Sequence, residues 1–425
     1  MKNRQISGNL LSLAFYVFFL LFLIFPLYSI IKEGLSIAYI KEVFGTPFYL
    51  SGMRNSLGIA IVSSLLTILI AFPLAFVSSR YDFPFKKMTQ LLILLPLILP
   101  PFVGALGYEQ FFGQTGVLNT LLINCGILAF DQPIDWLAKG RFWVVCMIEA
   151  FHLYPILYLN LLSSMQAINP AFDDAARSLG SSPFKRFKEI TLPLMKGGFF
   201  SGLTIVFIWS FTELGTPLMI GYNTVIPVQI FNGITELGSN PLPYTLVLIM
   251  LLFVFILYLI GHGLFGKHYG ADQKMTFSST PQELSGAKKY IPLALFLVVT
   301  LIAVIPHISI SLMSVSQNWY STLLPSAYTS RFYEQSLSHS YVIPSIFNSL
   351  SFSISATLLC CIIGVTLAVV VERVKPAGYQ LLDTLGMMPL AIPGLILAFG
   401  YLSVSTRYDF LKAFLDPFKN PTMLL

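Results

Sequence analysis

Three ionisable side chains inside apolar stretches of the chain lie where they could do chemistry. Glu149 and His152 are three residues apart, so a helix would present both on one face, and Glu213 precedes Gly215 and Pro217, residues that interrupt helices. For Glu149 and His152 the sequence leaves three interpretations: hydrogen bonds between helices, the lining of a translocation path, or ligation of a metal. For Glu213 the alternatives are a path or gate position and a plain kink with a buried carboxylate.

A metal site at Glu149 and His152 would need a second Glu-x-x-His motif on a facing helix. Proteins that bind metals in a helix bundle through Glu-x-x-His take one such motif from each of two facing helices, and this sequence contains no second copy of it. Neither a metal-binding nor a disulfide-framework spacing occurs among the four cysteines, which are Cys125, Cys146, Cys360 and Cys361. We therefore predict no metal site, no cofactor and no catalytic residue.

The composition indicates which kind of protein holds these residues. Of the 425 residues, 56% are hydrophobic and 10% are charged, whereas a soluble domain has about 25% charged residues. A helix needs about 20 apolar residues to cross a bilayer. Nine runs of that kind occur, near residues 9–31, 56–79, 88–108, 142–166, 197–221, 243–265, 291–313, 345–371 and 381–403. The predicted fold class is an all-α, polytopic membrane helix bundle of about nine spans.

The basic residues predict the orientation of these spans. If the N-terminus is cytoplasmic, most of the 25 lysine and arginine residues fall on the shorter, inner set of loops, as the positive-inside rule requires. The net charge of +6 then reflects membrane topology. No basic, aromatic-interleaved soluble segment occurs, so we predict membrane lipid and no nucleic acid among the partners.

A short charged island separates the fourth and fifth apolar runs. Asn169 suits the N-cap of a helix, Pro170 suits its first position, and Gly180 suits its end. Ser182 begins a second short helix, which we expect to end at Pro193. The island is therefore predicted to be a helix-turn-helix elbow on the inner side of the membrane.

This elbow resembles the coupling loop in the inner-membrane permeases of binding-protein-dependent ABC importers, which have the type 1 transmembrane domain. The matching positions are Asp174, Ala175, Ala176, Gly180, Ile190, Leu192 and Pro193. The family usually has glutamate where this chain has Asp174. In that family the loop docks into a cytosolic ATPase and transmits its stroke. The resemblance implies two partners, a cytosolic ABC ATPase subunit and a periplasmic or lipid-anchored substrate-binding protein.

The chain itself is not expected to bind nucleotide. Gly261–Lys267 nearly matches a phosphate-binding loop, but His268 replaces the serine or threonine that would contact magnesium. The segment also ends an apolar run, whereas the motif follows a strand. We therefore place ATP hydrolysis on a separate subunit and predict that this chain is not an enzyme.

An internal repeat predicts how the spans are arranged. Asn55–Leu57 recurs as Asn348–Leu350, and one constant shift in numbering also pairs other polar and helix-breaking residues. The further pairs are Arg80 with Arg373, Pro96 with Pro389, Pro100 with Pro393, and Gly107-Tyr108 with Gly400-Tyr401. The repeated spans are six crossings apart and so run in the same direction. The halves are therefore related by an axis along the membrane normal, unlike inverted repeats.

The repeat also gives the predicted domain organisation. Residues 1–50 form an N-terminal span and outer loop, 51–266 a first complete permease copy, 267–343 a linker with the seventh span and an outer loop, and 344–425 a second, truncated copy. The second copy has no counterpart of the elbow. A second permease chain that supplies the missing half is therefore a further predicted partner.

The predicted function is the permease subunit of an ATP-driven importer in the bacterial inner membrane. The sequence segments from Glu149 to Pro155 and from Glu213 to Pro217 resemble those of the fused ferric-iron permeases, whose relatives import thiamine, polyamines or phosphonates. We therefore expect iron as the transported ion. The predicted path residues are Glu149, His152, Glu213, Gly215 and Pro217. Two alternatives stay open, an ion-coupled secondary transporter with parallel repeats and a membrane-embedded metalloenzyme.

Overall fold

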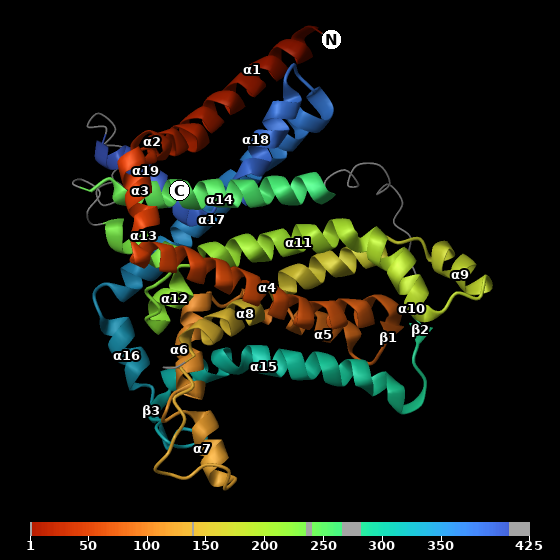
Figure 1. Cartoon of the computed structure of the whole chain (residues 1–425), viewed down its shortest axis with the longest axis vertical. Helices are drawn as coiled ribbons and strands as arrows, with labels where there is room; N and C mark the ends of the chain where they lie inside the picture. The colour runs from red at the N-terminus through yellow and green to blue at the C-terminus, as the bar shows by residue number, and fades with distance from the viewer. Residues whose placement is uncertain (1, 138–139, 235–239, 266–281, 408–425) are drawn as a thin grey trace. The chain divides into compact units, whose positions relative to one another are not determined.

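The chain folds almost entirely into helices (Figure 1). The computed structural model describes residues 2–137, 140–234, 240–265 and 282–407. Within these ranges, seven helices are long and apolar enough to cross a membrane, and the number is nine if each of two bent helix pairs is one span. Each of the nine apolar runs coincides with one of these spans. The predicted all-α, polytopic fold class is confirmed.

One compact unit comprises residues 51–228 and 256–329. Its core lies around α8 (Arg141–Gln166), which packs along α11 (Leu192–Thr212). The α8 side chains that meet α11 include Leu157, Asn160 and Ser164, whereas the fully buried Tyr154 and Tyr158 turn their hydroxyls to Ile93 and Ser78. Where the two helices approach most closely, α11 presents glycines, because a small residue lets two membrane helices come into backbone contact.

Two spans are sharply broken at matching places in the repeat. The helical segments Lys86–Leu97 and Pro101–Asn124 meet at 96°, and Tyr379–Pro389 and Gly394–Ser405 meet at 100°. Each break falls at prolines that the repeat pairs, and proline removes a backbone hydrogen bond from a helix. The repeat pairing of these prolines therefore corresponds to a shared structural feature, a break at the same place in each copy. The elements involved are α5 (Lys86–Leu92), η2 (Leu95–Leu97), α6 (Pro101–Phe112), α7 (Val117–Asn124), α18 (Tyr379–Ala391) and α19 (Gly394–Arg407).

The span that precedes each repeat packs against the broken span of the other repeat. In the unit described above, α15 (Tyr290–Ser314) lies on α6, and the backbone at Pro306 fits against Gly107, where a Cβ atom would lie 2.7 Å from the Cα of Pro306. In the second compact unit, α2 (Phe25–Gly34) lies on α19, with Gly400 against Pro26. Gly107 and Gly400 are repeat counterparts, so the same contact forms twice.

The second compact unit comprises residues 1–50, 229–255 and 330–425. A hydrogen bond of 2.7 Å joins the hydroxyls of Ser29 on α2 and Ser403 on α19, and α1 lies beside α18 (Figure 1). Its remaining elements, two of which continue into the other unit, are α1 (Lys2–Phe19), η1 (Leu20–Ile24), α3 (Ile37–Gly45), α13 (Ile226–Gly233), α14 (Leu242–Phe265), α16 (Arg331–Ser338), α17 (Val342–Val369) and η7 (Val370–Val374).

Short strands flank α15 in the sequence. Before it, β2 (Gln282–Glu283) pairs in parallel with β1 (Tyr81–Asp82), which directly follows α4 (Pro47–Arg80). After it, β3 (Ser316–Asn318) pairs antiparallel with β4 (Ala327–Tyr328). These two-residue and three-residue strands carry no periodic signal and were not predicted. The Gly261–Lys267 segment reaches past the end of α14, and its last two residues lie outside the described residues, as does the chain after 407.

Candidate functional site

The predicted elbow is present at the end of α8, between that helix and α11 (Figure 1). It consists of α9 (Pro170–Ser178), α10 (Pro183–Arg186) and the π-helical turn η3 (Phe187–Thr191). The Asn169 side chain accepts a hydrogen bond of 3.0 Å from the backbone nitrogen of Ala171, and the Ser182 side chain accepts one of 3.4 Å from that of Lys185. Both predicted N-caps are confirmed.

Gly180 ends α9 as predicted. Its φ of 75° lies in the left-handed region, which favours glycine. The backbone nitrogen of Gly180 donates to the carbonyl of Arg177 at 3.0 Å, and that of Ser181 donates to the carbonyl of Ala176 at 3.0 Å. This pair of bonds is the Schellman arrangement, which satisfies carbonyls at a helix end. The turn therefore sets the direction in which the chain leaves α9.

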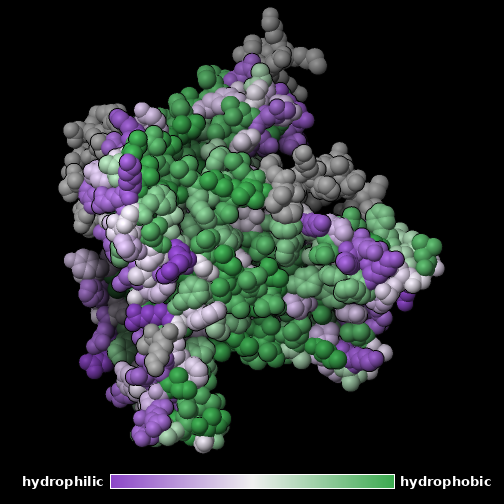
Figure 2. All heavy atoms as spheres, in the orientation of Figure 1, coloured by the Kyte–Doolittle hydropathy of each residue, from purple (hydrophilic) through white to green (hydrophobic). Residues whose placement is uncertain are grey.

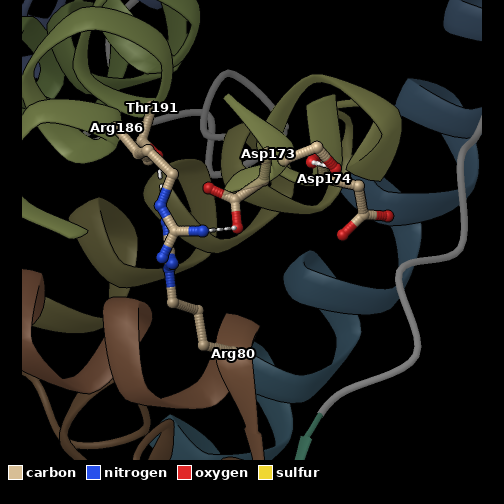
Figure 3. Close-up of polar contacts among 6 residues, drawn as sticks. Arg80, Asp173, Asp174, Arg186 and Thr191 are labelled. Atoms are coloured by element: carbon tan, nitrogen blue, oxygen red, sulfur yellow. Dashed lines mark hydrogen bonds and ion pairs between the residues drawn. The ribbon is translucent and has the colours of Figure 1, made fainter. Parts of the chain in front are cut away.

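An ion pair closes the elbow. The Arg186 guanidinium on α10 lies 3.5 Å from an Asp173 carboxylate oxygen on α9 (Figure 3). The Arg186 side chain is 12% exposed and that of Asp173 is 37% exposed, so water screens the pair on one side. The sequence did not predict this pair, because nothing in the spacing of the two residues shows that the turn brings them together.

The ion pair gives a local prediction. Arg186→Asp should loosen the elbow by less than about 1 kcal/mol, because a partly exposed pair contributes little, and Asp173→Arg combined with Arg186→Asp should recover part of that loss. Limited proteolysis within the elbow measures the effect. Asp174→Asn is the matched control, since the described ion pair does not include Asp174. Equal proteolysis of Arg186→Asp and Asp174→Asn would contradict the role given to the pair.

The base of the elbow is fixed to α4. The Arg80 guanidinium donates a hydrogen bond of 3.0 Å to the Thr191 hydroxyl (Figure 3). It also lies 4.9 Å from the centre of the Phe76 ring. The Phe187 ring meets those of Phe72 and Phe76 edge-on, at 5.9 Å between centroids. Cationic and aromatic contacts of this kind hold the end of η3 in place.

The prediction that Pro193 ends the second helix is wrong. The backbone stays helical from α10 through η3 into α11, and Pro193 is the second residue of α11. The π-turn explains this continuity, because the nitrogen of Leu192 bonds the carbonyl of Phe187, five residues back. Proline has no backbone hydrogen to donate, and Pro193 stands directly after the π-turn, where the regular i→i−4 bonding is already interrupted. The second half of the elbow, α10 and η3, therefore forms one continuous helical rod with α11.

The tip of the elbow is exposed. Asp174, Ala175 and Gly180 are exposed, Ala176 and Ile190 are half-buried, and Leu192 and Pro193 are exposed at the base. Three large apolar side chains on and beside the short helices also face outward: Phe172 and Phe184, and Leu179 with 87% of its surface exposed. In Figure 2, hydrophilic and hydrophobic side chains alternate over α9 and α10.

A second set of candidate residues lies inside the unit. Glu149 on α8 is 1% exposed, and its Oε1 has no hydrogen-bond partner. Glu213 lies between α11 and α12 (Gly215–Ile220), where its Oε1 accepts a hydrogen bond of 3.1 Å from the backbone nitrogen of Thr216. The predicted helix break beside Glu213 is confirmed, and Pro217 is buried in the first turn of α12.

Glu149 and His152 share a helix but have different neighbours. His152 Nδ1 lies 2.9 Å from the carbonyl oxygen of Pro96 at the broken span, and its ring lines a small cavity with Tyr108 and His307. Glu149 instead interacts with Glu213. No group of three or more His, Cys, Asp or Glu side chains within the described ranges is arranged to hold a metal ion. The interpretation in which Glu149 and His152 together ligate a metal therefore gains no support.

Comparison with known proteins identifies the domain that contains both sets of residues. The model of the family described as "Binding-protein-dependent transport system inner membrane component" matches residues 67–268. This range includes α8, the elbow, α11 and the Glu213 break. Residues 67–268 are a permease domain of this family. The candidate elbow thus lies within the permease domain, between two of its membrane-spanning helices.

Relatives named as permeases match the chain, and a solved structure has a similar fold. The chain is 25% identical over 414 residues to a ferric transport system permease protein of Actinobacillus pleuropneumoniae, with 94% of this chain and 58% of that protein covered. A putative ferric permease of Haemophilus influenzae is also 25% identical, with 94% and 64% covered. The chain thus spans about three fifths of the length of these relatives. A crystal structure of a bacterial alginate ABC transporter matches with a TM-score of 0.50 at 17% identity, over 63% of this chain and 97% of that one.

Proposed function

We propose that this chain is the membrane-spanning permease subunit of an ATP-driven importer, and that the Asp174–Pro193 loop couples it to a separate cytosolic ABC ATPase. The observation that carries the proposal is the elbow itself, whose tip is exposed while its base is anchored, inside a matched permease domain. Exposed Phe172, Leu179 and Phe184 provide apolar contacts for a protein partner, because grouped apolar side chains on a surface commonly mark interaction sites.

The mechanical route from the elbow into the membrane follows from its continuity with α11. A force applied at α9 reaches α10 through the Asp173–Arg186 pair and then passes along the uninterrupted helix from α10 to Thr212. The helix stops beside Glu213, so the break lies at the far end of the rod. ATP-driven closure of the ATPase would bias the permease between inward-open and outward-open states, each favoured by different contacts.

Orientation and partners complete the proposal. The coupling loop must face the cytoplasm to meet an ATPase, which agrees with the positive-inside count and a cytoplasmic N-terminus. We propose a periplasmic or lipid-anchored substrate-binding protein as the second partner, and a second permease chain as a further one. A solved relative of 16% identity is described in complex with a pentasaccharide-bound periplasmic protein, which supports a partner of this kind.

We propose ferric iron as the transported ion. Two ferric permeases cover most of this chain at 25% identity, while shorter relatives are named for spermidine and putrescine, sulfate or molybdate. The match over nearly the whole chain favours iron, because the shorter relatives cover between 38% and 58% of it. The carboxyl groups of Glu149 and Glu213 near the break fit a cationic substrate better than an anionic one, because carboxylates attract cations and repel anions.

Crosslinking tests the coupling proposal directly. A photoreactive residue at position 176, near the exposed tip of α9, should capture an ABC ATPase subunit in intact cells, identified by mass spectrometry. The matched control is the same residue at position 338, at the exposed end of α16. Capture of the ATPase from position 338 as efficiently as from 176, or from neither position, would contradict docking at the elbow.

A further inference from the structure

Glu149 is a buried carboxyl group for which the structure, over the residues it describes, shows no positively charged partner. Its side chain is 1% exposed, its Oε1 has no hydrogen-bond partner, and the ion pair between Asp173 and Arg186 does not include it. Burying an ionised carboxylate without a partner is strongly unfavourable, because nothing replaces the water that stabilises its charge. The carboxyl group therefore requires either a proton or a bound cation.

Two further groups converge on the same place. Glu213 comes near Glu149 because the segment that follows it packs on α8, with Leu214 against the cluster that contains Val145 and Cys146, so the two carboxyl groups act on each other electrostatically. Thr216 is fully buried, at 0% exposure, and its hydroxyl lies beside both carboxyl groups without forming a well-aligned hydrogen bond. The backbone nitrogen of Thr216 already bonds Glu213 Oε1 at 3.1 Å, so this contact fixes Glu213 while the hydroxyl stays available.

The backbone adds to the negative potential and keeps the site close-packed. α11 ends at Thr212, directly before Glu213, and the last carbonyls of a helix carry partial negative charge. Gly215 allows a tight approach, because a Cβ atom there would lie 3.2 Å from Glu213 Oε1 and 2.9 Å from the Cβ of Phe102. His152 is the basic side chain one turn along α8, but its Nδ1 faces Pro96.

We propose that Glu149, Glu213 and Thr216 bind one hard metal cation at the break between α11 and α12. Carboxylate and hydroxyl oxygens are the ligands that hard cations prefer, and two carboxylates balance a charge of two. The binding site stands independently of the coupling elbow. Only its assignment to the transported ion rests on the proposed function, with which it agrees because ferric iron is a hard cation.

Binding of Mn²⁺ to the purified chain in lipid nanodiscs tests the site, since Mn²⁺ is a hard cation that electron paramagnetic resonance detects. Wild-type protein should bind one Mn²⁺ tightly. Glu149→Gln should weaken binding by about 100-fold or more, because changes to groups around a metal already cost 10- to 100-fold. Thr216→Val, which removes only the hydroxyl, should also weaken it. Glu109→Gln, on an exposed carboxylate of the same unit, is the control and should bind like wild type.

Two results would overturn the proposal. One is equal Mn²⁺ affinity in Glu149→Gln, Thr216→Val and wild type. The other is wild-type protein without bound Mn²⁺, together with an infrared band of a protonated carboxyl group that Glu149→Gln removes, since a proton would then occupy the site. Size-exclusion profiles confirm that each variant is folded. An elbow variant that loses uptake but retains Mn²⁺ separates the coupling proposal from this one.

Discussion

Replacing Gly180 with valine should reduce uptake of radioactive ferric iron about tenfold while ATP hydrolysis by the assembled importer continues. Gly180 has a φ of 75°, and a β-branched residue is strained by about 1–2 kcal/mol in that region. A strain of about 1.4 kcal/mol is enough to shift a conformational equilibrium about tenfold. The turn would then give up the bonds to Arg177 and Ala176, and α9 would no longer hold its angle to α10.

The cause of this effect can be isolated, because a Cβ atom at Gly180 meets no other atom within 4 Å. Gly126 is the matched control: its φ is 71° and its surroundings are equally open, but it lies outside the elbow. Gly126→Val should retain uptake. An equal loss of uptake in both variants would trace the effect to general strain, and full uptake in Gly180→Val would refute coupling through the elbow.

The same uptake assay tests the transported ion. If unlabelled molybdate reduced the uptake of label and unlabelled ferric iron did not, iron would be refuted as the transported ion.

The elements of the elbow could be predicted from the sequence because they depend on neighbouring residues. Asn169, Ser182 and Gly180 act within a few residues of their own positions, so their types alone predicted the caps and the turn. The Arg80 contact with Thr191 joins residues 111 positions apart, so no local sequence pattern predicts it. The end of the second helix was wrongly predicted at Pro193, because the π-turn formed by the preceding residues lets the helix continue.

The candidate path shows the same division between local and tertiary information. The break beside Glu213 follows from adjacent glycine and proline, and it was predicted. The shared face of Glu149 and His152 was also predicted, but α8 is surrounded by other helices, so residues one turn apart on that face contact different elements. The contacts between spans were not predictable either. The repeat shows which residues occupy equivalent positions, but it does not show which spans pack together.

The second large effect is expected where α11 meets α8. Gly198→Ala should destabilise the unit by about 1–3 kcal/mol, the usual cost of overpacking. The added Cβ atom would overlap the Ser164 hydroxyl and lie 2.8 Å from the carbonyl oxygen of Asn160. Thermal unfolding in detergent, followed by size exclusion, measures the loss. Gly202 faces the same stretch of α8 one turn further along, at 2.9 Å from the Cβ of Asn160, so the small residues form a continuous seam.

A matched glycine shows whether packing or helix propensity decides the outcome. Gly104 on α6 has no atom within 4 Å of an added Cβ, so Gly104→Ala should be neutral or slightly stabilising, because alanine favours helix more than glycine does. Adding Ser164→Ala to Gly198→Ala should recover part of the loss, since it removes the hydroxyl that the new methyl overlaps. If Gly198→Ala were as stable as Gly104→Ala, the close approach of α8 and α11 would be disproved, and with it the rigid connection from the elbow to Glu213.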